Sequence, residues 1–310
     1  MGMKIKTSQS ILIYYFSGTG NTARVTDMIA SEFEKSGTKV RKLSIEDPQA
    51  LDLDLSKYTK IGLGYPVHAF NAPEFVFDFV EKLYILDEKP CFVYKTSGDP
   101  LMNGGSTHLI REALRNQGLN VFYERLFIMP ANVAIEFEPS LIKQLVLLAK
   151  RTAKLVADEI LSGTERLQKN GWFNRVSSKI FSKLETSGVK WLGKRFKILQ
   201  SCTFCGLCEK ICPTKNIEIQ DDKITHSDKC MLCMRCVYTC PEDAIKIKYA
   251  DFFRIKKMDF SQQAFDNFLH DPEIKPDFLN SKTRGIFKHY YKFFKNSEDY
   301  SDLLIGKSKG

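Results

Sequence analysis

The stretch YFSGTGNTA, residues 15–23, follows an apolar run and opens a segment with helical periodicity. A glycine-rich turn between a strand and a helix is typical of a phosphate-binding site, because backbone N–H groups and the helix N-terminus attract an anion. The spacing fits two kinds of site. As G-x-G-x-x-A it matches the fingerprint of dinucleotide binding, and as S/T-x-T-G-x-T it forms a hydroxyl-lined cup for one phosphate.

The side chains of this loop favour the single phosphate. Four short hydrogen-bonding residues surround the two glycines, and such a set suits a terminal phosphate dianion. The loop holds no lysine, which argues against a Walker-type nucleotide site. However, Glu46 and Asp47 end the next apolar segment, about where the ribose-binding acid of a dinucleotide site lies. We therefore favour a mononucleotide and leave the dinucleotide open.

The first half of the chain alternates between apolar runs and segments of helical periodicity. This alternation predicts a parallel sheet with helices on both faces. In such sheets a ligand binds beyond the carboxyl ends of the strands, where the loop 17–22 lies. The predicted strands are 11–16, 40–45, 60–65, 91–96 and 121–129, and the predicted helices are 21–35, 73–83, 106–116 and 139–161.

Two further loops follow the third and fourth predicted strands, at 64–73 and 96–105. With these loops, residues 10–160 resemble the flavodoxin family, whose members bind FMN through a phosphate loop after the first strand and ring-holding loops after the third and fourth. The resemblance implies a doubly wound, five-stranded parallel sheet and non-covalent FMN. It implies these cofactor-binding residues: Ser17, Gly18, Thr19, Gly20, Asn21, Thr22, Tyr65, Pro66, Val67, His68, Phe70, Asn71, Thr96, Ser97, Gly98 and Asp99.

The individual roles in the ring loops stay open. Tyr65 and Phe70 are candidates to stack on the flavin ring, and core packing is an equal alternative for each. His68 either bonds the flavin or is an ordinary loop histidine. We name no catalytic residue, because no dedicated acid–base pair is visible in the first half of the chain. His68 and Asp99 are the only titratable candidates in these loops.

Nine cysteines mark the redox character of the chain, and eight of them lie between Cys202 and Cys240. The ninth, Cys91, stands in an apolar run and is interpreted as a core residue. No apolar run is long enough to span a bilayer, and the first ten residues show no secretory signal. We therefore expect a cytoplasmic, reducing location, where dense cysteines indicate metal binding rather than disulfides.

The eight cysteines form two copies of C-x₂-C-x₂-C-x₃-C-P, at 202–213 and 230–241, with a period of 28 residues. Soft thiolates at this spacing bind iron–sulfur clusters, and the fourth cysteine of each copy serves the other cluster. Zinc ribbons, the alternative, use pairs of cysteines instead of triplets. Short strands are expected at 217–219 and 244–247.

Residues 200–248 resemble the bacterial two-cluster ferredoxins, which implies a small α+β domain with two [4Fe–4S] clusters. The resemblance assigns Cys202, Cys205, Cys208 and Cys240 to one cluster. It assigns Cys212, Cys230, Cys233 and Cys236 to the other.

These observations predict four parts: a flavodoxin-like domain at 1–165, a basic amphipathic connector at 166–200, a ferredoxin-like domain at 201–250 and an aromatic-rich extension of unassigned role at 251–310. The connector carries nine basic and one acidic residue, net +8 of the chain's +9. We expect it to dock between the domains. Contact of 171–198 with a membrane surface or with an acidic redox partner stays open. No nucleic-acid motif accompanies the charge.

Residues 10–250 together resemble proteins that fuse a flavodoxin to a ferredoxin. The resemblance implies an electron-transfer iron–sulfur flavoprotein of an anaerobic cell. It would pass electrons between two [4Fe–4S] clusters, FMN and an external redox partner or low-potential donor. Two alternatives remain: a flavin-dependent reductase of a small organic substrate fed through the clusters, and a redox sensor. The sequence specifies neither the direction of electron flow nor the oligomeric state.

Overall fold

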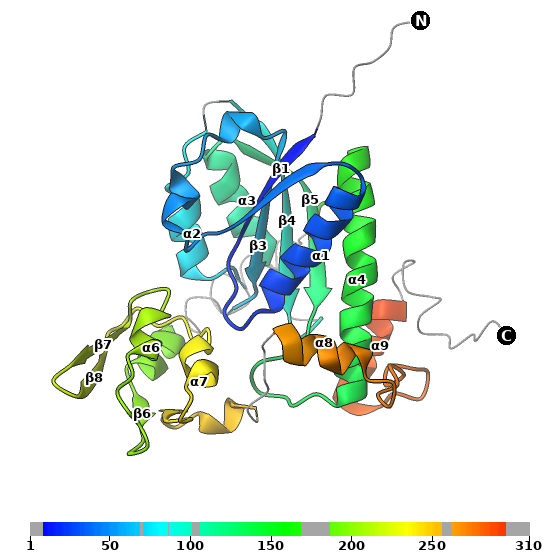
Figure 1. Ribbon diagram of the computed structural model, residues 1–310. Helices are drawn as coiled ribbons and strands as arrows, with labels where there is room; N and C mark the ends of the chain where they lie inside the picture. The colour runs from blue at the N-terminus through cyan, green and yellow to red at the C-terminus, as the bar shows by residue number, and fades with distance from the viewer. Residues whose placement is uncertain are drawn as a thin grey trace, which may run out of the picture.

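The computed structural model describes residues 9–68, 71–85, 87–100, 106–168, 187–255 and 262–295. Its centre is a five-stranded sheet with the strand order β2-β1-β3-β4-β5, in which every neighbouring pair is parallel. The strands are β1 (Ser10–Tyr15), β2 (Lys39–Ser44), β3 (Lys60–Pro66), β4 (Lys89–Ser97) and β5 (Leu119–Ile128). Figure 1 shows the sheet between two layers of helices.

The two faces of the sheet have separate cores because side chains alternate along each strand. On one face, Ile11 and Ile13 pack with α1 (Asn21–Lys35) and α4 (Pro139–Ser162). On the other face, Leu12 and Tyr14 pack with α2 (Glu74–Val80) and α3 (Ser106–Asn116). The predicted doubly wound, flavodoxin-like α/β fold is confirmed.

The boundaries of these elements differ little from the prediction. Helix α2 is shorter than expected and ends at Val80. The connection after β2 contains two 3₁₀ turns that the sequence pattern did not predict, η1 (Pro48–Leu51) and η2 (Leu55–Lys57). They form because the carboxylates of Asp47 and Asp54 accept the N–H groups two residues ahead, as capping aspartates do.

The cysteine-rich region forms a small second domain beyond the carboxyl ends of the strands (Figure 1). Residues 187–193 are helical and lead into β6 (Phe196–Ile198), which pairs antiparallel with β9 (Ile245–Ile247). Between them lie α6 (Leu207–Lys210), the hairpin β7 (Ile217–Gln220) and β8 (Lys223–His226), and α7 (Arg235–Thr239). Each of the two short helices follows a residue in the left-handed conformation, Gly206 and Met234, at the same position of the repeat. This is the predicted α+β ferredoxin-type domain.

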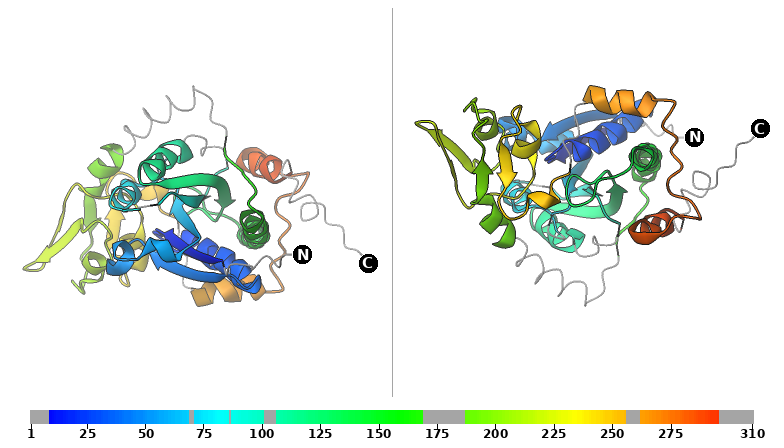
Figure 2. Two further views of the ribbon diagram at one scale, coloured as in Figure 1. Left: turned by 90° about the horizontal axis from the view of Figure 1, so that it is seen from above. Right: turned by 90° about the horizontal axis from the view of Figure 1, so that it is seen from below.

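The C-terminal extension begins on the second domain, where η3 (Asp251–Phe253) lies and Arg254 pairs with Asp243. The later elements α8 (Gln262–His270), η4 (Gly285–Phe287) and α9 (Lys288–Lys295) pack on the first domain. Helix α8 lies against α1, where the guanidinium of Arg24 stands 4.2 Å from the centre of the Phe265 ring. Helix α9 packs against α4, and Figure 2 shows α8 and α9 on opposite sides of α4.

Part of the connector lies outside the described residues. These are residues 169–186, which include the basic residues Arg175, Lys179 and Lys183 of the predicted amphipathic connector. From Ser187 onward the connector is described, and Lys190 pairs with Glu74 of α2 at 2.7 Å.

Candidate functional site

The loop between β1 and α1 has the geometry that an anion site requires. Gly20 caps α1 in the left-handed conformation (φ 99°), and no side chain caps the first turn of the helix. The N–H of Gly20 donates to Ser17 Oγ at 3.1 Å, which closes the turn. The loop lines a cavity of about 60 Å³, large enough for a small group such as a phosphate.

Three other loops complete this cavity, and all lie at the carboxyl edge of the sheet. Thr22 and Thr96 share a buried hydrogen bond of 2.8 Å between their hydroxyls. Asn21 Nδ2 donates to Pro130 O at 2.8 Å, and Asn132 Nδ2 donates to Thr19 Oγ1 at 3.1 Å. The lining residues are Ser17, Gly18, Thr19, Asn21, Thr22, Pro66, Val67, His68, Thr96, Ser97, Gly98, Met129, Pro130, Ala131 and Asn132.

The segment 129–132 was not among the predicted site residues. Its position directly after the fifth strand could have indicated a role, because the carboxyl ends of all five parallel strands lie at the same edge of the sheet.

Of the remaining predicted cofactor residues, those that the structure describes lie around the cavity without lining it. Tyr65 is fully buried in the core under α2. Asn71 closes the loop after β3 through two main-chain hydrogen bonds with His68. Asp99 pairs with His289 of α9. Gly20 supports the turn, and a Cβ there would come within 2.7 Å of the Arg24 side chain. Phe70 lies outside the described residues.

His68 carries an unsatisfied polar atom in the wall of the cavity. Its Nδ1 is buried and has no hydrogen-bond partner among the described residues, while the imidazole also bonds to the main chain of Met231. Burial lowers the pKa of His68 to about 4, so the ring is neutral near pH 7. A buried nitrogen without a partner is costly unless a ligand satisfies it. The hydroxyl-rich loop suits a phosphate group, and the His68 nitrogen suits a polar group of the same ligand. FMN carries groups of both kinds.

The eight clustered cysteines gather around two separate small cavities. The first, called here the cluster I site, is lined by Cys202, Cys205, Cys208 and Cys240. The second, the cluster II site, is lined by Cys212, Cys230, Cys233 and Cys236. Each site takes three cysteines from one motif and the fourth from the other motif.

The two sites have equivalent backbone hydrogen bonds to sulfur. The N–H of Phe204 points to Cys202 Sγ at 3.5 Å, and that of Leu232 to Cys230 Sγ at 3.4 Å. The fourth cysteines, Cys240 and Cys212, accept from Ala244 and Asn216 at 3.3 and 3.2 Å. Such bonds stabilise negative charge on thiolates, and four thiolates per site fit a [4Fe–4S] cluster.

These cysteine sets differ from the ligands of a single ion. Among residues 9–295, leaving out the undescribed gaps, no three His, Cys, Asp or Glu side chains lie close enough together to bind one metal ion. A cubane offers a separate iron atom to each cysteine, so its ligands need not converge on one point.

The cluster II site lies directly against the phosphate loop. The guanidinium of Arg235 donates to Ser17 O at 2.6 Å and to Gly18 O at 3.1 Å, and it also pairs with Glu46 at 2.7 Å. A Cβ on Gly18 would come within 2.7 Å of the carbonyl oxygen of Cys233.

A second contact between the domains runs through Asn132. The hydroxyl of Tyr238 donates to Asn132 O at 2.5 Å, and the Asn132 side chain in turn donates to Thr19. Sequence reasoning did not identify Arg235 or Tyr238. In the first motif the equivalent positions, 28 residues earlier, are Leu207 and Lys210.

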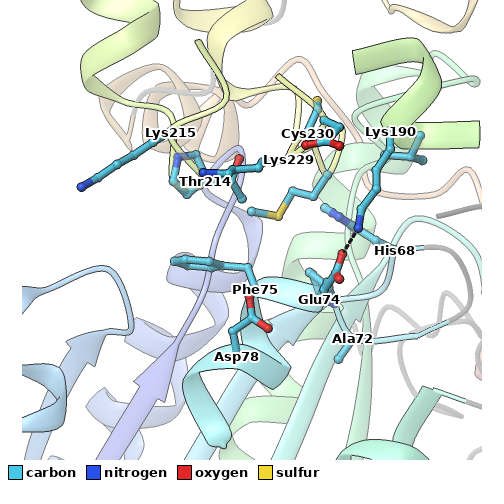
Figure 3. A pocket seen from close by; sticks show the side chains of 15 residues that line it. His68, Ala72, Glu74, Phe75, Asp78, Lys190, Thr214, Lys215, Lys229 and Cys230 are labelled. Atoms are coloured by element: carbon cyan, nitrogen blue, oxygen red, sulfur yellow. Dashed lines mark ion pairs between the residues drawn. The ribbon is translucent and has the colours of Figure 1, made fainter. Parts of the chain in front are cut away.

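A cavity of about 470 Å³ opens between the two domains, beside the cluster II site (Figure 3). His68 and Phe75 line it from the first domain, and Cys230 and Met231 line it from the second. Figure 3 shows the ion pair between Lys190 and Glu74 at one side of this cavity.

Comparison with known families matches two separate parts of the chain. Residues 12–122 match the model of a flavodoxin domain, and residues 201–244 match that of a 4Fe–4S dicluster domain. The chain belongs to the fused flavodoxin–ferredoxin proteins. Its flavodoxin domain identifies FMN as one cofactor, and its dicluster domain identifies two [4Fe–4S] clusters as the others.

Relatives of this flavodoxin–ferredoxin fusion match its second domain. A ferredoxin of Methanothermococcus thermolithotrophicus is 46% identical over 46 residues, which are 14% of this chain and 77% of that protein. A polyferredoxin of Methanothermus fervidus is 38% identical over 70 residues, so the match covers 22% of this chain and only 17% of the relative. Among solved structures, a flavodoxin from the domain Archaea is 19% identical with a TM-score of 0.35, covering 49% of this chain and 99% of its own.

Both domains of the fusion are of electron-transfer types, so the chain has an electron-transfer role and needs a redox partner. Within the described residues, no helix combines the length and apolar character required to span a bilayer.

Proposed function

We propose that this fusion passes electrons between its two [4Fe–4S] clusters, its FMN and an external redox partner. A flavin accepts two electrons and a cubane one, so the pair links one-electron to two-electron chemistry. The observation that carries the proposal is the contact of Arg235 with the carbonyls of Ser17 and Gly18. It holds the cluster II site against the proposed FMN phosphate loop, and electron transfer requires such proximity.

The proposed ligands follow from the cavities. For FMN we propose the loop 17–22, the segments 66–68 and 96–98, and the newly identified segment 129–132. Tyr65, Phe70, Asn71 and Asp99 remain proposals for support of the ring loops. For the clusters we propose the two crossed cysteine sets that define the cluster I and cluster II sites.

The cluster I site is the proposed contact for the external partner. Cys205 is exposed, and 39% of the surface of the neighbouring Phe204 is accessible to solvent. Leu232, which is equivalent to Phe204 in the second motif, packs into the core of the second domain. None of the four cysteines of the cluster II site is exposed in this way. A partner would therefore meet the cluster I site at the surface, while the cluster II site faces the flavodoxin domain and, at Cys230, the cavity between the domains.

The test is anaerobic purification followed by cofactor analysis and a redox titration. The proposal requires about one FMN and about eight irons per chain, and reversible reduction by a low-potential donor. A Phe204→Glu variant should slow exchange with a partner protein without loss of iron or FMN. Lys223→Glu, on the hairpin tip, serves as the control. FAD or NAD in place of FMN, or a partner rate unaffected by Phe204→Glu, would contradict the proposal.

A second candidate, a flavin-dependent reductase of a small organic substrate, is favoured by the cavity between the domains. This cavity is large enough for a small molecule and lies beside both His68 and Cys230. Filling it tests the idea: Ala72→Phe should abolish saturable oxidation of the reduced protein by a small metabolite and spare exchange with one-electron acceptors. If no metabolite oxidises the reduced protein in a saturable way, the reductase candidate fails.

We also propose the four-part division at 165, 200 and 250, and a cytoplasmic location. The proposed role of the connector is to dock between the domains, which the ion pair of Lys190 with Glu74 supports. Peripheral membrane contact through 171–198 is testable by binding to anionic vesicles, and it should disappear in a variant without Lys194 and Arg195.

A further inference from the structure

The C-terminal extension is built into the flavodoxin domain. Gln144 of α4 holds the main chain of Leu279 twice: its Oε1 accepts the N–H of Leu279 at 2.7 Å, and its Nε2 donates to the carbonyl at 3.2 Å. Beyond this point Tyr290 and Phe294 of α9 are buried against α4 in one apolar cluster. The position of α9 relative to the sheet is therefore fixed by packing.

From this position α9 reaches the loop that follows β4. The hydroxyl of Tyr290 donates to Gly98 O at 2.5 Å, and His289 Nε2 lies 3.1 Å from Asp99 Oδ2. Tyr290 is almost completely buried. Burial and the nearby Asp99 carboxylate raise the pKa of Tyr290, so its hydroxyl keeps the proton that it donates.

The loop 97–99, to which Tyr290 and His289 bond, forms one wall of the cavity assigned to FMN. Ser97 and Gly98 both line that cavity. On the other side Gly98 meets Ala131, because a Cβ added to Gly98 would lie 2.8 Å from the Ala131 Cβ. Gly98 is thus held between Ala131 and the hydroxyl of Tyr290. Neither His289 nor Tyr290 lines the cavity.

We propose that α9 is part of the flavin site, with Tyr290 and His289 as positioning residues that hold the loop 97–99 at the edge of the FMN cavity. The proposal rests on the assignment of this cavity to FMN. It gives the C-terminal extension a role in cofactor binding, although the flavodoxin domain model ends at residue 122, far from α9 in the sequence.

The test compares two tyrosines that are neighbours on α9. Tyr290→Phe removes the hydroxyl and keeps the ring, whose centre stands 5.9 Å from that of Phe137. Tyr291→Phe is the matched control, since its ring lies beside Lys295. FMN is removed from the full-length protein with its clusters intact and titrated back. Tyr290→Phe should raise the Kd for FMN about five- to tenfold, the effect of one hydrogen bond, and His289→Gln should add to it.

A second readout separates positioning from general stability. The visible circular dichroism of bound FMN should change in Tyr290→Phe, while the cluster EPR signals and the melting temperature stay as in the wild type. An FMN Kd within twofold of wild type in the double variant would overturn the proposal. A weaker Kd that comes with a lower melting temperature and an unchanged FMN spectrum would overturn it as well.

The assignment of the cavity is tested separately by Thr22→Val. If this variant binds FMN as the wild type does, the proposed FMN site itself is wrong. If Thr22→Val loses FMN and Tyr290→Phe does not, only the role of α9 fails.

Discussion

Arg235 of the ferredoxin domain forms a two-pronged ion pair with Glu46 of the flavodoxin domain, with both N–O distances at 2.7 Å. The two residues are 189 positions apart in the sequence. Both side chains are largely shielded from water. A charged pair in such a setting needs good geometry to compensate for lost hydration, and the planar guanidinium provides it. Because Arg235 also binds the phosphate-loop carbonyls, this pair fixes how the two domains meet.

The first prediction concerns this pair. Arg235→Leu introduces the residue found at the equivalent position of the first motif, Leu207, so the ferredoxin domain should still fold and bind both clusters. The domain contact should weaken by about 1.5–3 kcal/mol, the range for hydrogen bonds to a charged group. Electron exchange between FMN and the clusters should slow, as measured by flash reduction and optical detection.

Arg195→Leu is the control for the first prediction, because the Arg195 guanidinium stacks on Trp191 within the second domain. It should leave the exchange rate unchanged. Equal rates in Arg235→Leu and in the wild type would mean that the observed docking is not the one used for electron transfer.

The second prediction concerns the crossed cysteine sets. Cys240→Ala should damage the cluster I site, although Cys240 is closer in sequence to the three cysteines of the second motif. Cys212→Ala should damage the cluster II site in the same crossed way. EPR of the reduced protein distinguishes the two signals, and Cys91→Ala, in the buried core, should change neither. Selective loss of the second-motif cluster in Cys240→Ala would refute the crossed sets.

The third prediction concerns the phosphate loop. Thr22→Val keeps the shape of the side chain and removes the hydroxyl that meets Thr96 in the buried cavity. FMN binding should weaken by about 1–3 kcal/mol, the cost of an unsatisfied buried group, as measured by fluorescence titration. Thr225→Val, on the exposed strand β8, is the control and should not change FMN affinity.

The sequence predicted those parts of the molecule that depend on local pattern. The five strands and the helices α1 and α3 follow from apolar periodicity, and the ferredoxin-type domain follows from the fixed spacing of the cysteines, both of which act over short distances. The contacts of Arg235 and Tyr290 could not be predicted this way. Each joins segments about 190 or more residues apart, and their identity depends on how whole domains and the C-terminal extension pack.

Glu46 illustrates the same limit. In the sequence it stands where a ribose-binding acid would lie in a dinucleotide site, and it argued against a mononucleotide. In the folded protein its carboxylate is taken up by Arg235. The sequence pattern correctly placed Glu46 at the carboxyl edge of the sheet, next to the proposed cofactor loops. It could not predict that the group bound by Glu46 is an arginine of the second domain.

The last prediction tests the close approach of the two domains at a single atom. Gly18 lines the phosphate cavity, and a Cβ on it would come within 2.7 Å of Cys233 O and 3.2 Å of Cys233 Cβ. Gly18→Ala should therefore push the second motif away from the loop at a cost of about 1–3 kcal/mol, typical of overpacking. The EPR signal of the cluster II site should shift, while that of the cluster I site should not.

Gly188→Ala provides the matched control for Gly18→Ala. A Cβ at Gly188 meets no atom within 4 Å, and residues 187–193 are helical, so alanine should be neutral or slightly stabilising there. If Gly18→Ala leaves both cluster signals and the FMN affinity as in the wild type, Cys233 does not contact the loop in solution. The cluster II site would then lie farther from the loop 17–22 than the structure has it, and the slower exchange expected for Arg235→Leu would lose its structural basis.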